Sequence, residues 1–234
     1  LNGEGEGIQM VGKDQKFEPY NPVCEDWLAQ SVTFIPGEEV VSVKVKGNYK
    51  EAEGVLEYRF HKNGEVTFTY DFTMLQDISP RQTGLVFTLP SSFTHLDWER
   101  KGYWTVYPED NIDALKGEAE AFDKSLPVSG LAGPSKQPLK PWSYDQTAAG
   151  SNLFRSTKEN IYRAGLKSKE GNSVTVISDG TQHVRPWIEK EATRLLVAGY
   201  NNPGRENFLI PHAEKGYRPL KRGDKVEGVV KLVF

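Results

Sequence analysis

The segment from Ser178 to Trp187 carries the side chains best suited to chemistry in this chain of 234 residues. Within ten residues it brings together Asp179, His183, Arg185 and Trp187. Aromatic faces, combined with planar polar groups that make paired hydrogen bonds to adjacent hydroxyls, are the groups that hold sugars. The segment therefore predicts a sugar-binding loop. An ordinary connecting loop, whose tryptophan packs into the core, stays open as the alternative.

A second set of candidate residues lies between positions 96 and 110. Trp98 follows Leu96 at alternating spacing, so we expect it in the core. Trp104 and Tyr107 fall on a predicted loop with Asp110, where an exposed aromatic ring can stack on a sugar. Core packing remains the alternative for these aromatic residues.

Metal and nucleophile chemistry have little support in the sequence. The four histidines, His61, His95, His183 and His212, include no pair at metal-ligand spacing. Cys24 is the only cysteine, so no intramolecular disulfide can form, and we expect an idle thiol. No metal and no cofactor is predicted.

The elements that must position these residues are strands. Val66 to Met74 alternates apolar and polar residues with strict period two, and valine-rich or aromatic runs precede it at Val40 to Val45 and Val55 to Phe60. Asn63-Gly64 predicts a hairpin with a two-residue type I′ turn. We expect further strands at residues 84–89, 93–99, 160–167, 173–178, 193–200 and 226–233.

Helical periodicity is poor throughout the chain. The best helix candidate, Asn111 to Lys124, breaks at Gly117, so at most a turn or two is expected there. Many strands at short spacing with almost no helix predict an all-β fold, a large antiparallel β-sandwich.

The composition predicts one large domain. Residues 1–37 are rich in Gly, Pro and acidic residues and are assigned to a linker or to the end of a preceding domain, and residues 38–234 to a sandwich domain. Residues 125–151 form a long loop rich in Pro and Gly. A net charge of −3 argues against nucleic-acid binding, and no apolar run reaches membrane-spanning length. Because the chain starts at Leu1 rather than Met, we expect a piece of a longer protein.

Residues 80 to 117 carry a resemblance to a known family. They contain Pro80-Arg81, Leu96-Asp97-Trp98, Gly102 and Tyr107-Pro108-Glu109-Asp110. This pattern resembles the signature of the C-terminal β-sandwich domain of family 2 glycoside hydrolases of the β-galactosidase type. Glu109 is inserted relative to that signature, and Asn111 stands where the family has arginine.

The resemblance implies a galactose-mutarotase-like antiparallel sandwich that is not catalytic by itself. Such a domain supports the catalytic barrel of the same polypeptide and contributes to binding a galactoside-like carbohydrate. The barrel itself needs about 250 residues of alternating strand and helix, which this chain does not have. The residues expected at the sugar-facing edge are Trp104, Tyr107, Asp110, Asp179, His183, Arg185 and Trp187.

Two alternatives stay open. A structural or interaction module without sugar contact would expose an apolar patch. A sugar mutarotase or epimerase would need a histidine acid, for which His183 or His95 is available, and a glutamate base facing the same pocket. The sequence does not indicate which glutamate that would be.

Overall fold

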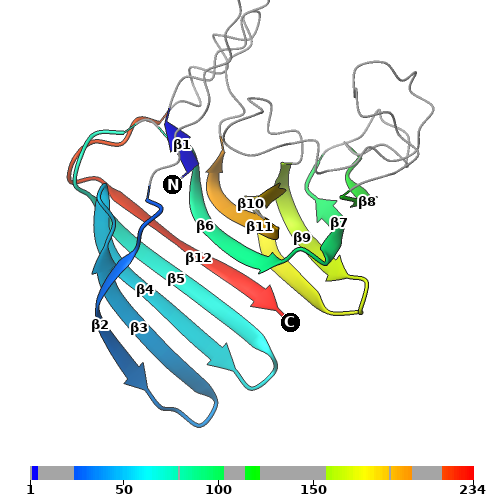
Figure 1. Ribbon diagram of the computed structural model, residues 1–234, viewed down its shortest axis with the longest axis horizontal. Helices are drawn as coiled ribbons and strands as arrows, with labels where there is room; N and C mark the ends of the chain where they lie inside the picture. Colours follow the sequence, from blue (N-terminus) through cyan, green and yellow to red (C-terminus); the bar gives the residue numbers. More distant parts are fainter. Residues whose placement is uncertain are drawn as a thin grey trace, which may run out of the picture. The chain divides into compact units, whose positions relative to one another are not determined.

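The computed structural model describes residues 2–4, 24–78, 80–102, 114–121, 157–189, 191–201 and 218–234 (Figure 1). All regular secondary structure among these residues is β. The strands are β1 (Asn2–Glu4), β2 (Leu28–Ile35), β3 (Val40–Asn48), β4 (Ala52–His61), β5 (Glu65–Met74), β6 (Pro80–Pro90), β7 (Phe93–Arg100), β8 (Lys116–Glu120), β9 (Lys158–Ser168), β10 (Ser173–Glu189), β11 (Ala192–Asn201) and β12 (Lys225–Val233). The described part contains no helix with the length and apolarity that a membrane span requires. The predicted all-β, antiparallel fold class is confirmed.

The described residues divide into two compact units. The first unit is built from those within residues 1–85 and 198–233, and the second from those within residues 86–197, with Phe234. In the first unit, β2, β3, β4, β5 and β12 lie side by side in that order, and β1 pairs with β6. Strand β2 falls within residues 1–37, which the sequence analysis assigned to a linker, and pairs with β3 from Leu28 to Ile35.

The alternating run in β5 places one row of side chains in the interior of the first unit. Tyr70, Phe72 and Met74 are buried, whereas Asp71 is exposed on the opposite face. Neighbouring strands continue this row, because Tyr70 stands opposite Leu56 of β4 on one side and Gly228 of β12 on the other. Period two thus gives the sheet one apolar face, as the sequence predicted.

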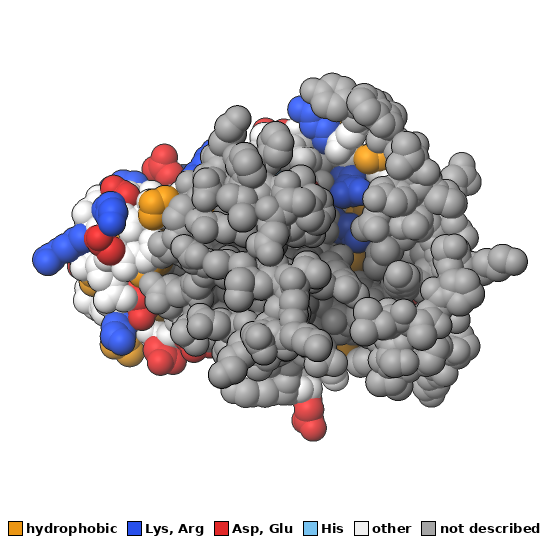
Figure 2. Space-filling model, turned by 90° about the horizontal axis from the view of Figure 1, so that it is seen from above, with side chains coloured by type: hydrophobic (Ala, Val, Ile, Leu, Met, Phe, Trp, Pro, Cys, Tyr) orange, Lys and Arg blue, Asp and Glu red, His pale blue; other side chains and the backbone are white. Residues whose placement is uncertain are grey.

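The opposite face of this sheet is charged. Lys44 of β3 stands opposite Glu57 of β4, and Arg59 also binds the Glu57 carboxylate at 2.9 Å. The hydrogen bonds from Arg59 hold the pKa of Glu57 below its ordinary value. In the view of Figure 2, acidic side chains lie beside basic ones on the described surface.

The predicted hairpin between β4 and β5 is confirmed, but its predicted turn type is wrong. Residues 62–64 connect the strands, and Gly64 has a φ of 83° while Asn63 is not among the residues with positive φ. A type I′ turn requires positive φ at both central residues. Instead, the backbone N–H of Glu65 donates to the Asn63 side chain at 3.0 Å, so this side chain stabilises a longer connection.

In the second unit, β8, β7, β9 and β10 are neighbours, followed by β11 and β6. Leu96 and Trp98 of β7 are buried, and Trp98 stands opposite Ala164 of β9 and Gly117 of β8. The Trp98 indole N–H donates to the carbonyl of Ala114 at 2.9 Å. The expectation that Trp98 belongs to the core is confirmed, and its polar atom is satisfied.

The expected helical turns between Asn111 and Lys124 are wrong for residues 116–120, which form β8. Pairing with β7 overrides the helix propensity of the alanines there, because a strand at this position buries Ala119 next to Leu96. Gly117 fits this role, since a Cβ on it would lie 2.6 Å from the Trp98 ring.

The packing of Tyr70 against β12 generates a matched test. A Cβ on Gly228 would lie 2.6 Å from Tyr70 Cζ, whereas a Cβ on Gly199 would lie 3.6 Å from Tyr70 Oη, an ordinary contact. We expect Gly228→Ala to lower the free energy of unfolding by about 1–3 kcal/mol through overpacking of the buried ring. Gly199→Ala should leave it unchanged or raise it slightly. Urea denaturation measures both, and equal values for the two variants would contradict the packing described.

Candidate functional site

Strand β10 changes register against β9 at the place where the sequence predicted a polar loop. Pairing is regular from Ser173 to Ile177, then shifts between Ile177 and Gln182 and again between Gln182 and Val184. The predicted loop is therefore an irregular part of a long strand that runs on to Glu189. Breaks of this kind re-aim side chains and are frequent beside active sites.

Asp179 begins the first irregularity and fixes its shape. The backbone N–H of Thr181 donates to Asp179 Oδ1 at 3.1 Å, and the Thr181 hydroxyl donates to the same oxygen at 2.5 Å. These hydrogen bonds, with a contribution from the charge of Lys101, hold the pKa of Asp179 below its ordinary value. Gly180, with a φ of 92°, completes the turn next to the side chains of Tyr162 and Lys101.

His183 lies at the second shift and contacts β9. The backbone N–H of Asn160 donates to His183 Nδ1 at 3.2 Å. Since Nδ1 accepts a hydrogen bond, the proton of the neutral ring is on Nε2. Burial lowers the pKa of His183, and the negative charge of the neighbouring Glu159 opposes part of this shift. The ring is therefore neutral around pH 7.

Asn160 holds this arrangement from the side of β9. It adopts a φ of 55°, a left-handed conformation that costs energy for any residue other than glycine but is tolerated best by asparagine and aspartate. Its N–H donates to His183, and its carbonyl accepts from the N–H of Lys101 at 2.7 Å. The backbone N–H and C=O of Asn160, the residue after Glu159, are thus both hydrogen-bonded, one to His183 and the other to Lys101.

Together these residues form what we call the β10 site. Asp179, Lys101 and Tyr162 are exposed, with Tyr162 at 42%, whereas His183 and Glu159 are half-buried. The site therefore combines a neutral histidine, a glutamate, one further charge of each sign and an aromatic ring, and parts of it are open to solvent. Its members are Lys101, Glu159, Tyr162, Asp179 and His183.

Arg185 and Trp187 do not lie on an exposed edge, contrary to the expectation. Arg185 is 2% exposed and Trp187 is 7% exposed, and the guanidinium carbon lies 4.9 Å from the centroid of the indole ring. The pair is a cation–π contact in the interior of the second unit. The alternative from the sequence, a tryptophan that packs in the core, describes Trp187 correctly.

A second buried cation was not predicted. Lys158, at the start of β9, is 1% exposed, and its ammonium nitrogen lies 4.5 Å from the centroid of the Trp98 ring. Sequence reasoning also missed Glu159, which is one of 32 acidic residues and follows no recognisable motif. The only signal was its position at the edge of a predicted strand.

Several predicted residues lie outside the described parts of the chain. Trp104, Tyr107 and Asp110 belong to this group, as does the Pro/Gly-rich segment 125–151. Their assignment to a sugar-facing edge stays a prediction.

The other described histidines have ordinary partners. His61 Nε2 lies 3.1 Å from the Thr67 hydroxyl, and His95 lies between Glu118 at 3.3 Å and Glu120 at 3.0 Å. Within the described ranges, no group of three or more His, Cys, Asp or Glu side chains is arranged to hold a metal ion.

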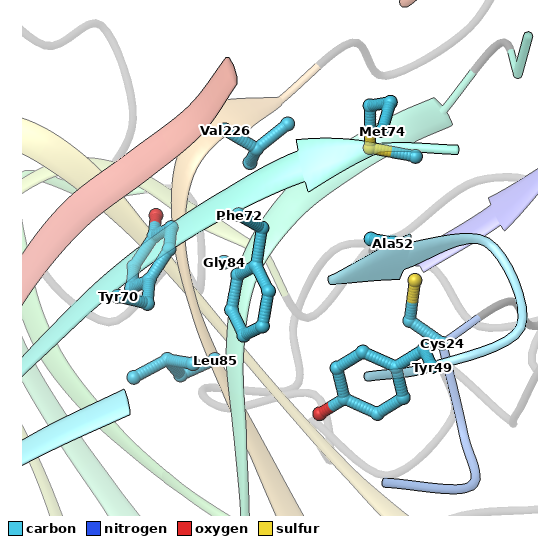
Figure 3. A pocket seen from close by; sticks show the side chains of 9 residues that line it. All are labelled: Cys24, Tyr49, Ala52, Tyr70, Phe72, Met74, Gly84, Leu85 and Val226. Atoms are coloured by element: carbon cyan, nitrogen blue, oxygen red, sulfur yellow. The ribbon is translucent and has the colours of Figure 1, made fainter. Parts of the chain in front are cut away.

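A small cavity of about 30 Å³ lies in the first unit (Figure 3). Its walls are mostly apolar and contain three titratable groups, Cys24, Tyr49 and Tyr70, and burial raises the pKa of Tyr70. Burial raises the pKa of the Cys24 thiol to about 11, and burial raises the pKa of Tyr49 to about 12. A cavity of this size holds little more than water, and none of the three groups ionises near neutral pH. The residues that line it are Cys24, Tyr49, Ala52, Tyr70, Phe72, Met74, Gly84, Leu85 and Val226.

Comparison with known proteins finds similar solved structures. No family model and no curated protein matches the chain. One similar structure is a galactose mutarotase-like protein from Lactobacillus casei ATCC 334, with 11% identity over 87% of this chain and 72% of that chain and a TM-score of 0.34. Another is a galactose mutarotase related enzyme from Lactobacillus acidophilus, with 12% identity over 89% of this chain and 70% of that chain and a TM-score of 0.32.

These findings overturn the resemblance to the C-terminal domain of family 2 glycoside hydrolases. The similar structures are galactose mutarotase-like proteins, and no family model matches, so the assignment to a β-galactosidase and the role of supporting its catalytic barrel are wrong. Two of the residues that suggested the family, Asp97 and Trp98, have structural roles within the second unit. Trp98 packs in the core, and Asp97 binds the side chains of Arg163 and Lys167.

Proposed function

We propose that the β10 site binds a cyclic sugar and transfers protons on it, as a mutarotase or sugar epimerase does. The observation that carries this proposal is the position of His183 opposite Asn160 and Glu159, at the second register shift between β10 and β9. The sequence had offered His183 as an acid for such a reaction but no glutamate as its base. The register shift of β10 brings the ring next to Glu159, close enough for the carboxylate charge to act on the pKa of the imidazole.

Opening the ring of an aldose needs two proton movements. A base takes the proton of the hydroxyl on the anomeric carbon. An acid gives a proton to the ring oxygen as the bond between the anomeric carbon and the ring oxygen breaks. Glu159 is assigned the role of the base and His183 that of the acid. Because Nδ1 of His183 is occupied by Asn160, the proton to be delivered is carried on Nε2.

The exposed members of the site have binding roles in this proposal. Tyr162 offers a ring face on which an apolar face of a sugar can stack. Lys101 and Asp179 offer a donor and an acceptor for hydroxyl groups. Carbohydrate binding by Trp104, Tyr107 and Asp110 remains a separate prediction from the sequence.

Catalysis is tested by polarimetry on freshly dissolved α-D-galactose and α-D-glucose. We expect the protein to accelerate the approach to the anomeric equilibrium. His183→Gln and Glu159→Gln should each reduce the catalysed rate about 10²- to 10⁴-fold, since each removes one proton-transfer group. Glu120→Gln, which changes a carboxylate beside His95 instead, should keep the rate. Absence of any acceleration, or full activity in His183→Gln, would refute the proposal.

The lowered pKa of His183 also predicts a change of stability with pH. Above about pH 6.5 the ring is neutral in both the folded and the unfolded chain, so its protonation contributes nothing. As the pH falls below this value, the unfolded chain binds a proton that the folded chain does not, and the free energy of unfolding decreases until the folded pKa is reached. Urea denaturation between about pH 7.5 and pH 5 should show a steeper loss for the wild type than for His183→Gln. Parallel curves would show that burial of His183 does not shift its pKa.

A further inference from the structure

Strand β2 is an open edge of the sheet in the first unit. The strand order ends at β2, and within the described residues no strand pairs with its outer side (Figure 1). Its inner side is paired with β3 from Leu28 to Ile35. Among the described residues, the outer backbone N–H and C=O groups of this strand therefore have no strand partner, which is the arrangement that an added extended segment uses.

Apart from an irregularity in its pairing between Ala29 and Ser31, the strand lacks the features with which proteins usually protect such an edge. Its eight residues, Leu-Ala-Gln-Ser-Val-Thr-Phe-Ile, include no charged residue and no proline. The large side chains point into solvent, with Val32 at 65% and Phe34 at 62% exposure. Edge strands that must stay unpaired generally carry lysine, proline or other charges.

The exposed side chains continue the apolar face of the sheet. Phe34 stands opposite Val43, and Val43 stands opposite Tyr58. Phe60 follows Tyr58 by two residues in β4, so it lies on the same face of the sheet, and it is 47% exposed. We call Val32, Phe34 and Phe60 the β2 patch. An apolar patch was the feature expected of an interaction module in the sequence analysis.

Acidic residues flank the strand at both ends. Glu25 and Asp26 precede it, Glu38 and Glu39 follow it, and all four are exposed. Lys62 binds Glu39 at 2.7 Å. A second copy of this chain that paired with β2 would bring acidic ends against acidic ends in either orientation, which is destabilising at the spacing of paired strands.

We propose that β2 is the docking edge for an extended segment of another protein, which adds to the sheet as a further strand. The acidic residues at both ends of β2 indicate that the partner segment has basic ends. Alternate apolar side chains would contact the β2 patch, and lysine or arginine at both ends of the segment would face Glu25, Asp26 and Glu38. Main-chain hydrogen bonds supply the affinity, and the patch and the acidic ends supply the selectivity.

The test uses two labelled peptides and fluorescence anisotropy with the full chain. The first peptide is Lys-Arg-Thr-Val-Thr-Val-Thr-Val-Arg-Lys, and the second carries glutamate in place of each lysine and arginine. We expect the basic-ended peptide to bind at least about tenfold more tightly than the acidic-ended one, with a difference that shrinks at high salt.

Two sets of variants connect this binding to β2. Val32→Lys should weaken binding of the basic-ended peptide about tenfold or more, whereas Val229→Lys, the same change at an exposed position of β12, should not. Changing Glu25, Asp26 and Glu38 to lysine leaves the strand intact and should reverse the preference between the peptides.

Three results would overturn the proposal. One is equal or undetectable binding of the two peptides to the wild type. Another is an equal loss in Val32→Lys and Val229→Lys, with circular dichroism showing both folded. The third is self-association of the chain, measured by sedimentation, that Val32→Lys abolishes, because the occupant of β2 would then be a second copy.

Discussion

The pairing of β9 on both of its sides is the constraint on which the candidate site depends. β7 and β10 both bond to this strand, and its pairing with each of them is irregular between Lys158 and Arg163. β10 has more residues than its pairing with β9 requires, and the extra residues lie between Ile177 and Gln182. The pairing resumes at Gln182 opposite Ile161 and shifts again before Val184 opposite Lys158. His183 therefore lies opposite Asn160 and Glu159.

The two units differ in the kinds of side chain that they bury. In the first unit the interior row of β5 is Tyr70, Phe72 and Met74, and the groups that line its cavity ionise only at high pH. In the second unit two cations, Lys158 and Arg185, are buried against indole rings. Burying a cation is costly, and aromatic faces offset part of that cost. The second unit thus buries charged side chains, while the open edge of the first unit is apolar.

Most strands could be predicted from the period-two alternation of apolar and polar residues, because one face of the sheet is buried in each unit. Val66 to Met74 could be assigned from its alternation, and so could the strands between residue 84 and residue 233 other than β8. The turn at Asn63 could not be assigned to a type, since its conformation depends on a hydrogen bond from Glu65. The segment 116–120 was misjudged because cross-strand contact with Trp98 outweighs the local preference of its alanines for helix.

The candidate site was only partly visible in the sequence. His183 and Asp179 were selected by residue type, and their segment was interpreted as a loop because it is polar. A bulged strand has the same composition, since its extra residues leave the ladder and bond locally, as Thr181 does to Asp179. Glu159 could not be selected, because its proximity to His183 arises from pairing between segments that a sequence does not place side by side.

The mistaken family resemblance has a related cause. Leu96-Asp97-Trp98 looks like a signature, but each residue is what a doubly paired strand requires at that point. Leu96 and Trp98 fill a buried row, and Asp97 on the opposite face binds Arg163 and Lys167 of the adjacent strand. Burial on one face and two basic neighbours on the other thus account for all three residues without a functional role. Short motifs inside strands therefore report packing, and a function is better argued from the places where the ladder is interrupted.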